Sequence, residues 1–114
     1  ACNTQSTEKL LNLVDHENVS TYWQPRHGLG PDKNSNDLKQ LVNKVTNVHV
    51  FHWWPDYKCR QMLKNGLKHW KRYFKIINND FTDRNACIEF VKEDKEANFF
   101  EDAKTLRSLI SNAT

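Results

Sequence analysis

Residues 56–75 combine a regular spacing of apolar side chains with a dense positive charge. The apolar residues recur at intervals of three or four positions, which places them on one side of an α-helix: Cys59, Leu63, Leu67, Trp70 and Phe74. Seven cations occupy the remaining surface: Lys58, Arg60, Lys64, Lys68, Lys71, Arg72 and Lys75. The stretch therefore predicts a basic amphipathic helix, with its apolar side packed and its cationic side facing outward.

The two ends and the middle of this predicted helix carry separate signals. Asp56 suits the N-cap position, because the Trp-Pro pair before it cannot continue a helix backwards. Gly66 is expected to weaken the middle by about 1 kcal/mol relative to alanine. After a break near Arg72, the β-forming side chains of residues 73–77 predict a short strand.

The other segments alternate between helical spacing, β-forming runs and turn residues. They predict helices over residues 6–17, from residues 34–36 onward and from about Asp94, an ordered loop over residues 22–32, and strands over residues 48–54 and 86–91. We therefore expect a small α+β domain with about four helices and a short sheet. A mostly helical bundle is the alternative.

The length of 114 residues fits one domain, residues 1–114, and residues 1–5 and 111–114 are expected to be flexible. The net charge of +3 is unevenly spread, because residues 58–75 carry seven bases and no acid, whereas residues 80–102 carry eight acids and three bases. This asymmetry predicts a positive face beside a negative one. Alternatively, the two segments neutralise each other across the fold.

Several features favour a secreted protein. No apolar run reaches the roughly 18 residues of a membrane span. The chain begins with Ala-Cys-Asn rather than Met, which suggests a processed N-terminus. Asn18-Val-Ser and Asn112-Ala-Thr are acceptor sequences for N-glycosylation.

Three cysteines cannot all pair within one chain. Cys59 and Cys87 are the best intrachain pair, and a bridge between them would stabilise the fold by about 3 kcal/mol. Cys2 would then be free or joined to another chain. The alternative is three reduced cysteines in an intracellular protein. Zinc-ligand spacing is absent from the sequence, so we expect neither a metal nor another cofactor.

Histidines are the natural candidates for proton transfer near neutral pH. His27 lies beside Arg26 in the glycine- and proline-rich loop, and His69 lies among lysines and arginines that lower its pKa and attract anions. We take His27 and His69 as the candidate catalytic pair. His16 is expected to be exposed on a polar helix face. His49 and His52 are three residues apart in a predicted strand, so they point to opposite faces and suit no shared metal.

Aromatic side chains interleave with the basic stretch, a combination typical of proteins that bind single-stranded nucleic acid, where cations contact phosphates and rings stack on bases. The predicted RNA- or anion-binding residues are Arg26, Lys64, Lys68, Lys71, Arg72 and Trp70. Two alternatives remain open. In the first, the aromatics simply form the core. In the second, the helix docks on an anionic membrane or an acidic protein surface.

Three short motifs occur in order along the chain: His-Gly-Leu-Gly-Pro-Asp at residues 27–32, Trp-Pro-Asp at residues 54–56, and Cys87 followed by the helix of residues 99–107. Together they resemble the ribonuclease T2 family, which includes the plant self-incompatibility ribonucleases. Residues 27–32, His-Gly-Leu-Gly-Pro-Asp, resemble the family's first active-site motif, His-Gly-Leu-Trp-Pro, often followed by Asp. Residues 54–56, Trp-Pro-Asp, resemble a later segment of those proteins. Cys87 and the helix of residues 99–107 resemble their later Cys and Tyr-Phe-x-x-Ala-x-x-Leu-Arg helix.

The resemblance implies RNA cleavage through the 2′-hydroxyl, with His27 at the position of the first-motif histidine. Gly30 replaces the Trp of that motif, the second motif, Glu-x-x-Lys-His-Gly, is absent, and the chain is shorter than the family's usual domain. His69 would then act as the second proton-transfer group, with Lys68 or Lys71 on the phosphate. These departures imply a weak or inactive nuclease that still binds RNA.

Our first hypothesis is a secreted, basic, ribonuclease-like protein that binds single-stranded RNA and is at most a weak endoribonuclease. The second is a secreted interaction protein, such as an effector, toxin subunit or receptor ligand, that docks through its basic helix or its acidic C-terminal segment. The third is an intracellular regulator that binds DNA or RNA.

Overall fold

The computed structural model describes residues 4–14, 20–26, 29–55, 58–79 and 84–112. Within these ranges the elements are, in chain order, α1 (Thr4–Val14), β1 (Thr21–Trp23), α2 (Pro31–Leu41), the 3-10 segment η1 (Val42–Lys44), β2 (Val45–Val50), β3 (His52–Trp53), β4 (Arg60–Gln61), the 3-10 segment η2 (Leu63–Gly66), α3 (Leu67–Asn78), β5 (Asn85–Ile88), the 3-10 segment η3 (Lys92–Asp94) and α4 (Glu96–Asn112).

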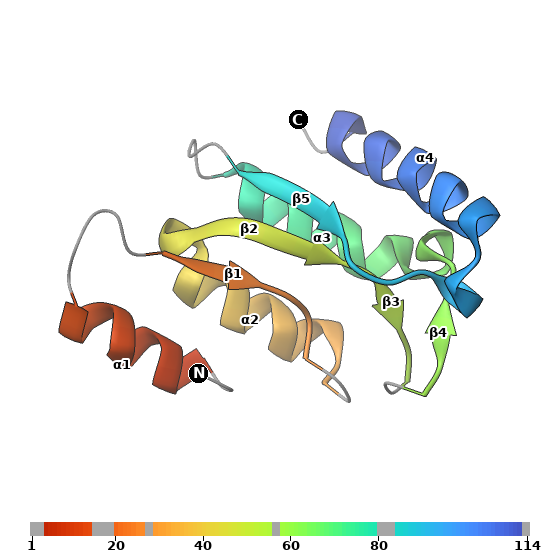
Figure 1. The fold of residues 1–114 in the computed structure, drawn as a ribbon. Coiled ribbons are helices and arrows are strands. Elements are labelled where there is room, and N and C mark those ends of the chain that lie inside the picture. The colour runs from red at the N-terminus through yellow and green to blue at the C-terminus, as the bar shows by residue number, and fades with distance from the viewer. Residues whose placement is uncertain (1–3, 15–19, 27–28, 56–57, 80–83, 113–114) are drawn as a thin grey trace.

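Strands β1, β2 and β5 form a parallel sheet in that order, and β3 and β4 form a small antiparallel hairpin. Helix α2 connects β1 to β2, and α3 lies in the connection from β2 to β5. Both connections step across the sheet in the same direction, and right-handed crossovers then place both helices on one face. Figure 1 shows α2 and α3 behind the sheet, with α1 and α4 at its two sides.

The main core lies between the sheet and this helix pair. Trp70 and Tyr73 are each 1% exposed, and Trp23 of β1 packs edge-on against both rings. The other buried apolar residues of the cluster are Leu11, Leu38, Leu41, Val45, Val48, Val50, Leu63, Phe74, Ile77, Leu106 and Leu109. The aromatics of the basic stretch therefore belong mainly to the core, which was one of the two alternatives.

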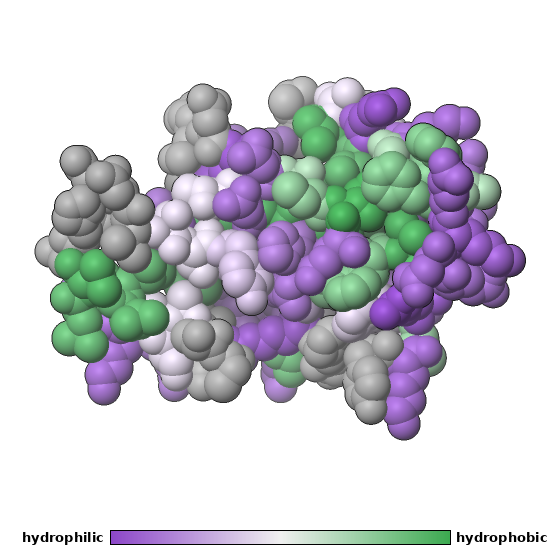
Figure 2. Space-filling model, in the orientation of Figure 1, coloured by the Kyte–Doolittle hydropathy of each residue, from purple (hydrophilic) through white to green (hydrophobic). Residues whose placement is uncertain are grey.

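The opposite face of the sheet carries exposed and half-buried side chains that are mostly polar: Tyr22, Asn47, His49, Asn85 and Cys87. Figure 2, viewed from this side, shows polar colours across the middle of the molecule. Parallel sheets usually bury both faces. Here the described elements cover one face, so the apolar core is one-sided.

The expectation of a small α+β domain is confirmed. The first helix spans residues 4–14, and residues 15–17 of the predicted range lie outside the described residues. The second helix starts at Pro31, and the last starts at Glu96. The predicted strand over residues 48–54 is two strands, β2 and β3, and the strand over residues 86–91 is the shorter β5. Within the loop predicted over residues 22–32, residues 22–23 belong to β1, which the sequence did not reveal.

The single helix predicted over residues 56–75 is wrong in its first half. Arg60 and Gln61 form β4 and pair with Trp53 and His52, and a 3-10 turn follows before α3 begins at Leu67. The guanidinium of Arg60 lies over the rings of Trp53 and Phe90, at 5.4 and 4.9 Å from their centroids. These contacts stabilise the extended conformation at Arg60, and they outweigh the intrinsic preference of arginine for a helix. The predicted N-cap, Asp56, lies outside the described residues.

The strand predicted over residues 73–77 is also wrong, because α3 continues to Asn78. Trp70, Tyr73, Phe74 and Ile77 are all buried, and their spacing of i, i+3, i+4 and i+7 fits one helix face. The helical periodicity therefore outweighs the β-propensity of the individual side chains.

Helix α1 leaves most of its apolar side chains exposed. Leu11 is the one described side chain of α1 that is buried, whereas Leu10, Leu13 and Val14 are 53, 75 and 46% exposed. Figure 2 shows hydrophobic side chains gathered over this helix.

Helix α4 includes Ser111 and Asn112, and α1 includes Thr4 and Gln5; these positions are among those predicted to be flexible. Among the described helices, none has the length and apolar content needed to cross a membrane.

Candidate functional site

A small hollow lies where β1 and β2 end, between the loop after β1, the segment after β2 and one side of α3. Its lining residues are Pro25, Arg26, Leu29, Asn34, Phe51, His52, Trp53, Trp54, His69, Trp70 and Tyr73. The carboxyl ends of parallel strands meet at one edge of a sheet, and this edge is where α/β proteins commonly place their binding sites. The hollow is therefore the first candidate for a functional site.

Asn34 holds the loop after β1 in position. The backbone N–H of Arg26 donates a hydrogen bond to Asn34 Oδ1 over 3.0 Å, and Asn34 Nδ2 donates to the carbonyl oxygen of Leu29 over 3.2 Å. Asn34 is 2% exposed and also hydrogen-bonds the side chain of Tyr73. Burial, partly offset by this hydrogen bond, raises the pKa of Tyr73 to about 12, so its hydroxyl stays protonated. One buried amide thus joins the loop to α3.

His52 forms the closed side of the hollow. It is 6% exposed, and burial, with the neighbouring His69 as a second cause, lowers its pKa to about 4. At neutral pH the ring is therefore neutral. Gly66 packs directly against this ring, because a Cβ built at Gly66 would overlap the imidazole of His52. The glycine that the sequence suggested as a weak point in a helix is needed for a close approach.

His69 and Trp54 form the open side. The ring of His69 lies edge-on to His52, at 5.4 Å between centroids, and edge-on to Trp54, at 5.0 Å. Trp54 is 37% exposed. Burial, followed by the charge of Arg72, lowers the pKa of His69 below its usual value. At neutral pH both imidazoles are mainly neutral, so the site offers hydrogen-bonding groups and ring surface rather than positive charge.

The cavity itself has a volume of about 20 Å³, which suffices for about one water molecule and is too small for a base or sugar. A larger ligand would have to contact the mouth of the hollow. The groups there are Trp54, His69 and the cations on the outer surface of α3.

The cations of the basic stretch differ in their partners. Arg72 Nη1 lies 2.6 Å from Asp32 Oδ1, and Arg60 Nη1 lies 2.7 Å from Asp94 Oδ1. Four further exposed cations make no ion pair with any residue in the described ranges: Lys64, Lys68, Lys71 and Lys75. Within those ranges, the acidic segment of residues 80–102 therefore neutralises Arg60 but leaves a row of lysines uncovered.

Several predicted site residues do not take part in the mouth of the hollow. Trp70 is buried, and its indole N–H donates to the carbonyl of Phe51 over 3.0 Å, so it offers no ring face to a base. Cys59 and Cys87 are free thiols, and the predicted bridge between them is not formed in the structure. Asn112 is the last residue of α4. His27, His16, Asn18 and Cys2 lie outside the described residues, although Arg26 and Leu29, on either side of residues 27–28, line the hollow.

His52, Gly66 and Asn34 are the contributors that the sequence did not reveal as site residues. The Trp-Trp pair after His52 was a signal for the aromatic mouth. However, the contact between His52 and Gly66 depends on the β3–β4 hairpin, which the helical prediction had excluded.

His49 belongs to a separate arrangement on the open face of the sheet. Its Nδ1 lies 3.1 Å from Glu89 Oε2 and 3.2 Å from Gln24 Oε1, and its ring stacks on Tyr22 at 4.5 Å between centroids. Two acceptor oxygens at Nδ1 place the proton on that nitrogen. His49 and His52 thus point to different faces, as predicted. In the part of the chain that is described, no group of three acidic, histidine or cysteine side chains is placed to hold a metal ion.

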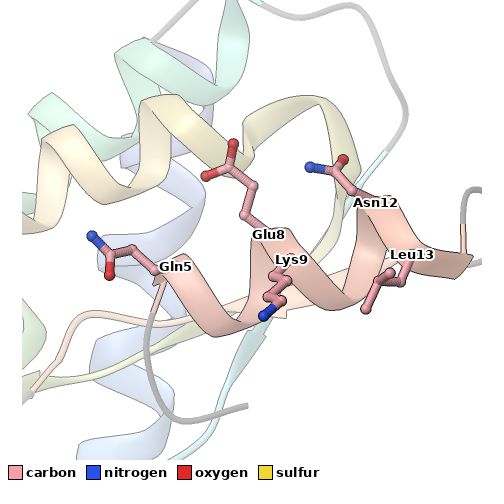
Figure 3. Close-up of a pocket in the computed structure, with 5 residues that line it drawn as sticks. All are labelled: Gln5, Glu8, Lys9, Asn12 and Leu13. Carbon is pink, nitrogen blue, oxygen red and sulfur yellow. The ribbon is translucent and has the colours of Figure 1, made fainter.

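A second concave surface follows one side of α1, formed by Gln5, Glu8, Lys9, Asn12 and Leu13. Figure 3 shows Glu8 and Asn12 pointing to one side of the helix and Lys9 and Leu13 to the other. Because the five side chains do not converge on a common point, we do not consider this surface a ligand site.

Compared with known protein families, curated proteins and solved structures, the chain matches none of them. The resemblance of three short segments to ribonuclease T2 proteins therefore stays a prediction. Any function has to be argued from the hollow and its surroundings.

Proposed function

We propose that this protein binds single-stranded RNA at the mouth of the hollow, with weak or no cleavage of the bound strand. In this proposal an unpaired base packs against Trp54 and His69, while the lysines of α3 contact its phosphates. Base stacking on aromatic side chains contributes about 1–3 kcal/mol per base, and it requires a strand whose bases are not already paired.

The observation that carries the proposal is the contact between Trp54 and His69. Their rings meet edge-on at 5.0 Å, and His69 follows Lys68 in the same helix. An exposed aromatic surface and uncovered positive charge thus occur side by side. Leu29 and Trp54, from two of the segments that resemble ribonuclease T2 proteins, line the same hollow and support this choice of ligand.

Weak catalysis follows from the protonation states. Cleavage through the 2′-hydroxyl needs one group to accept a proton and another to donate one. His52 stays neutral down to about pH 4 and is buried, so it is a poor proton donor at neutral pH. His69 can take one of the two roles, and His27 remains the predicted partner.

The test is the binding of a fluorescein-labelled uridine octamer, followed by anisotropy at 50 and 200 mM salt. We expect binding that weakens with salt, is lost in the triple variant Lys68→Glu/Lys71→Glu/Arg72→Glu, and is reduced at least tenfold in Trp54→Ala. Lys9→Glu, on α1, is the matched control and should bind normally. No binding of the unmodified protein at 50 mM salt would overturn the proposal.

Cleavage is measured separately with the same octamer. We expect at most slow product formation, abolished in His69→Ala and in His27→Ala while binding persists. Efficient cleavage that survives both changes would contradict the proposed roles of these histidines. Secretion and glycosylation at Asn18 and Asn112 remain predictions, which the mass of the protein purified from a secreting host would test.

Docking on a protein partner is the second candidate, favoured by the exposed aromatics of the acidic C-terminal segment. Phe99 and Phe100 are 43 and 56% exposed near the start of α4, and their rings pack together at 5.7 Å. Aromatic residues are enriched at the centres of protein interfaces. Capture of one defined partner that Phe99→Ser/Phe100→Ser abolishes, with no affinity for RNA, would favour this candidate.

A further inference from the structure

The outer surface of η2 and α3 carries four lysines in one row. Lys68, Lys71 and Lys75 follow each other at i, i+3 and i+7 in α3, and Lys64 precedes them by four residues in η2. Residues three and four apart lie on the same side of an α-helix, about 5–6 Å from each other, which aligns the three lysines of α3. Lys64 continues the row from the 3-10 segment, because it directly follows the buried Leu63, just as Lys71 and Lys75 directly follow the buried Trp70 and Phe74. All four side chains are exposed, and the opposite side of α3 holds the buried Trp70, Tyr73, Phe74 and Ile77.

From this row we infer that the lysines form a track for three to five consecutive phosphates of one strand, with a base at Trp54 and His69 beside it. This inference rests on the proposed function and adds the length of the bound strand and its course along α3. With a rise of 1.5–2.0 Å per residue, Lys64 and Lys75 are about 17 Å apart along the helix axis. Charges on one strand of a duplex are spaced about 3.4 Å apart along its axis, and the phosphates of an unpaired strand lie at least that far apart, so the row spans no more than about five steps from one phosphate to the next.

The charges in the row are available for a ligand. Within the described ranges, none of the four lysines makes an ion pair, whereas Arg72, beside the row, is paired with Asp32. The carboxylate of Asp32 is 87% exposed. This ion pair leaves the four lysines as the uncompensated charges of the surface, and the base contact at Trp54 and His69 requires an unpaired base, so the surface favours a single strand over a duplex.

The position of the aromatic mouth fixes the arrangement. His69 lies between Lys68 and Lys71, so the base contact lies near the middle of the track, which extends toward Lys64 on one side and toward Lys75 on the other. A dinucleotide would reach only the mouth and the nearest lysines. Affinity should therefore rise with length up to about five nucleotides and then change little.

The test uses uridine oligonucleotides of two, four, six and eight residues and an eight-base-pair RNA duplex, with binding measured between 50 and 300 mM salt. For single strands, the slope of log K against log salt is about −0.7 per phosphate neutralised. We expect a slope of about −2 to −3 for the octamer. Each of Lys64→Gln, Lys71→Gln and Lys75→Gln should make the slope less negative by about 0.7.

Lys39→Gln, an exposed lysine on α2, is the control and should leave the slope unchanged. If the octamer binds but its salt slope is the same in all three lysine variants, or if the duplex binds as tightly as the octamer, the inferred lysine track is wrong while RNA binding stands. If no oligonucleotide binds at 50 mM salt, the proposed function fails, and the track fails with it.

Discussion

The imidazole of His52 occupies the space in which a side chain at Gly66 would begin. Gly66 is buried at the junction of η2 and α3, and His52 opens the β3–β4 hairpin, so this contact joins the hairpin to the basic helix. The hollow keeps its shape because the backbone of one element lies directly against a ring of the other.

Gly66→Ala should lower the free energy of unfolding by about 2 kcal/mol, because the overpacking cost exceeds the gain in helix propensity. Urea denaturation would measure this. Gly30→Ala is the matched control, since a Cβ there would have no heavy atom within 4 Å. Combining Gly66→Ala with His52→Ala should recover part of the loss. A more stable Gly66→Ala protein would show that the contact is absent.

Stability should depend on pH through His52. Between pH 6.5 and about 4, the unfolded chain binds a proton at His52 that the folded protein excludes. The free energy of unfolding should therefore fall as the pH falls through this window, by up to about 3 kcal/mol. Burial raises the pKa of Asp102, which acts in the opposite direction. Urea denaturation at pH 7, 5.5 and 4.5 measures how the free energy of unfolding changes with pH. In His52→Gln this change should be smaller. If the variant shows the same pH dependence, His52 is not its source.

Asp32→Asn should increase the affinity for single-stranded RNA, because it releases Arg72 from its 2.6 Å ion pair. The salt slope should become more negative by about 0.7, the contribution of one additional phosphate contact. Asp94→Asn is the matched control. It frees Arg60 in the same way, but that guanidinium stays over the rings of Trp53 and Phe90 and should add nothing. Equal effects of both changes would mean that only net charge matters.

Arg84→Met should destabilise the fold by about 2–3 kcal/mol, because the guanidinium donates to carbonyl oxygens at the ends of three elements: Val42, Val45 and Ile77. Lysine cannot reproduce this planar set of donors, so Arg84→Lys should recover little. Thermal unfolding is the measurement, with the exposed Arg107→Met as control. Full stability of Arg84→Lys would show that charge alone suffices.

The buried side of the basic stretch could be predicted from sequence because its spacing is a local property. Leu63, Trp70 and Phe74 are buried as expected, and the lysines between them are exposed. The start of the helix could not be predicted in this way. Arg60 is held in a strand by Trp53, Phe90 and Asp94, and two of these residues come about thirty positions later in the chain.

The candidate site was predictable to a similar extent. His69, Lys68 and Lys71 were recognisable from the charge around them, whereas the neighbours of His52 follow from the packing of the hairpin on α3. Trp70 illustrates the limit, since an aromatic residue within a basic stretch has the same sequence signature whether it faces the core or a ligand. Its position on the apolar side of the helix was the signal that it belongs to the core.

The unequal burial of the tryptophans has a spectroscopic consequence. Trp23 and Trp70 are 5 and 1% exposed and Trp53 is half-buried, whereas Trp54 is 37% exposed at the mouth of the hollow and is the most accessible of the four. A water-soluble quencher such as iodide should reach Trp54 and spare the two core indoles. The protein thus contains its own fluorescent reporter, in which occupancy of the mouth can be followed as protection from quenching without an attached dye.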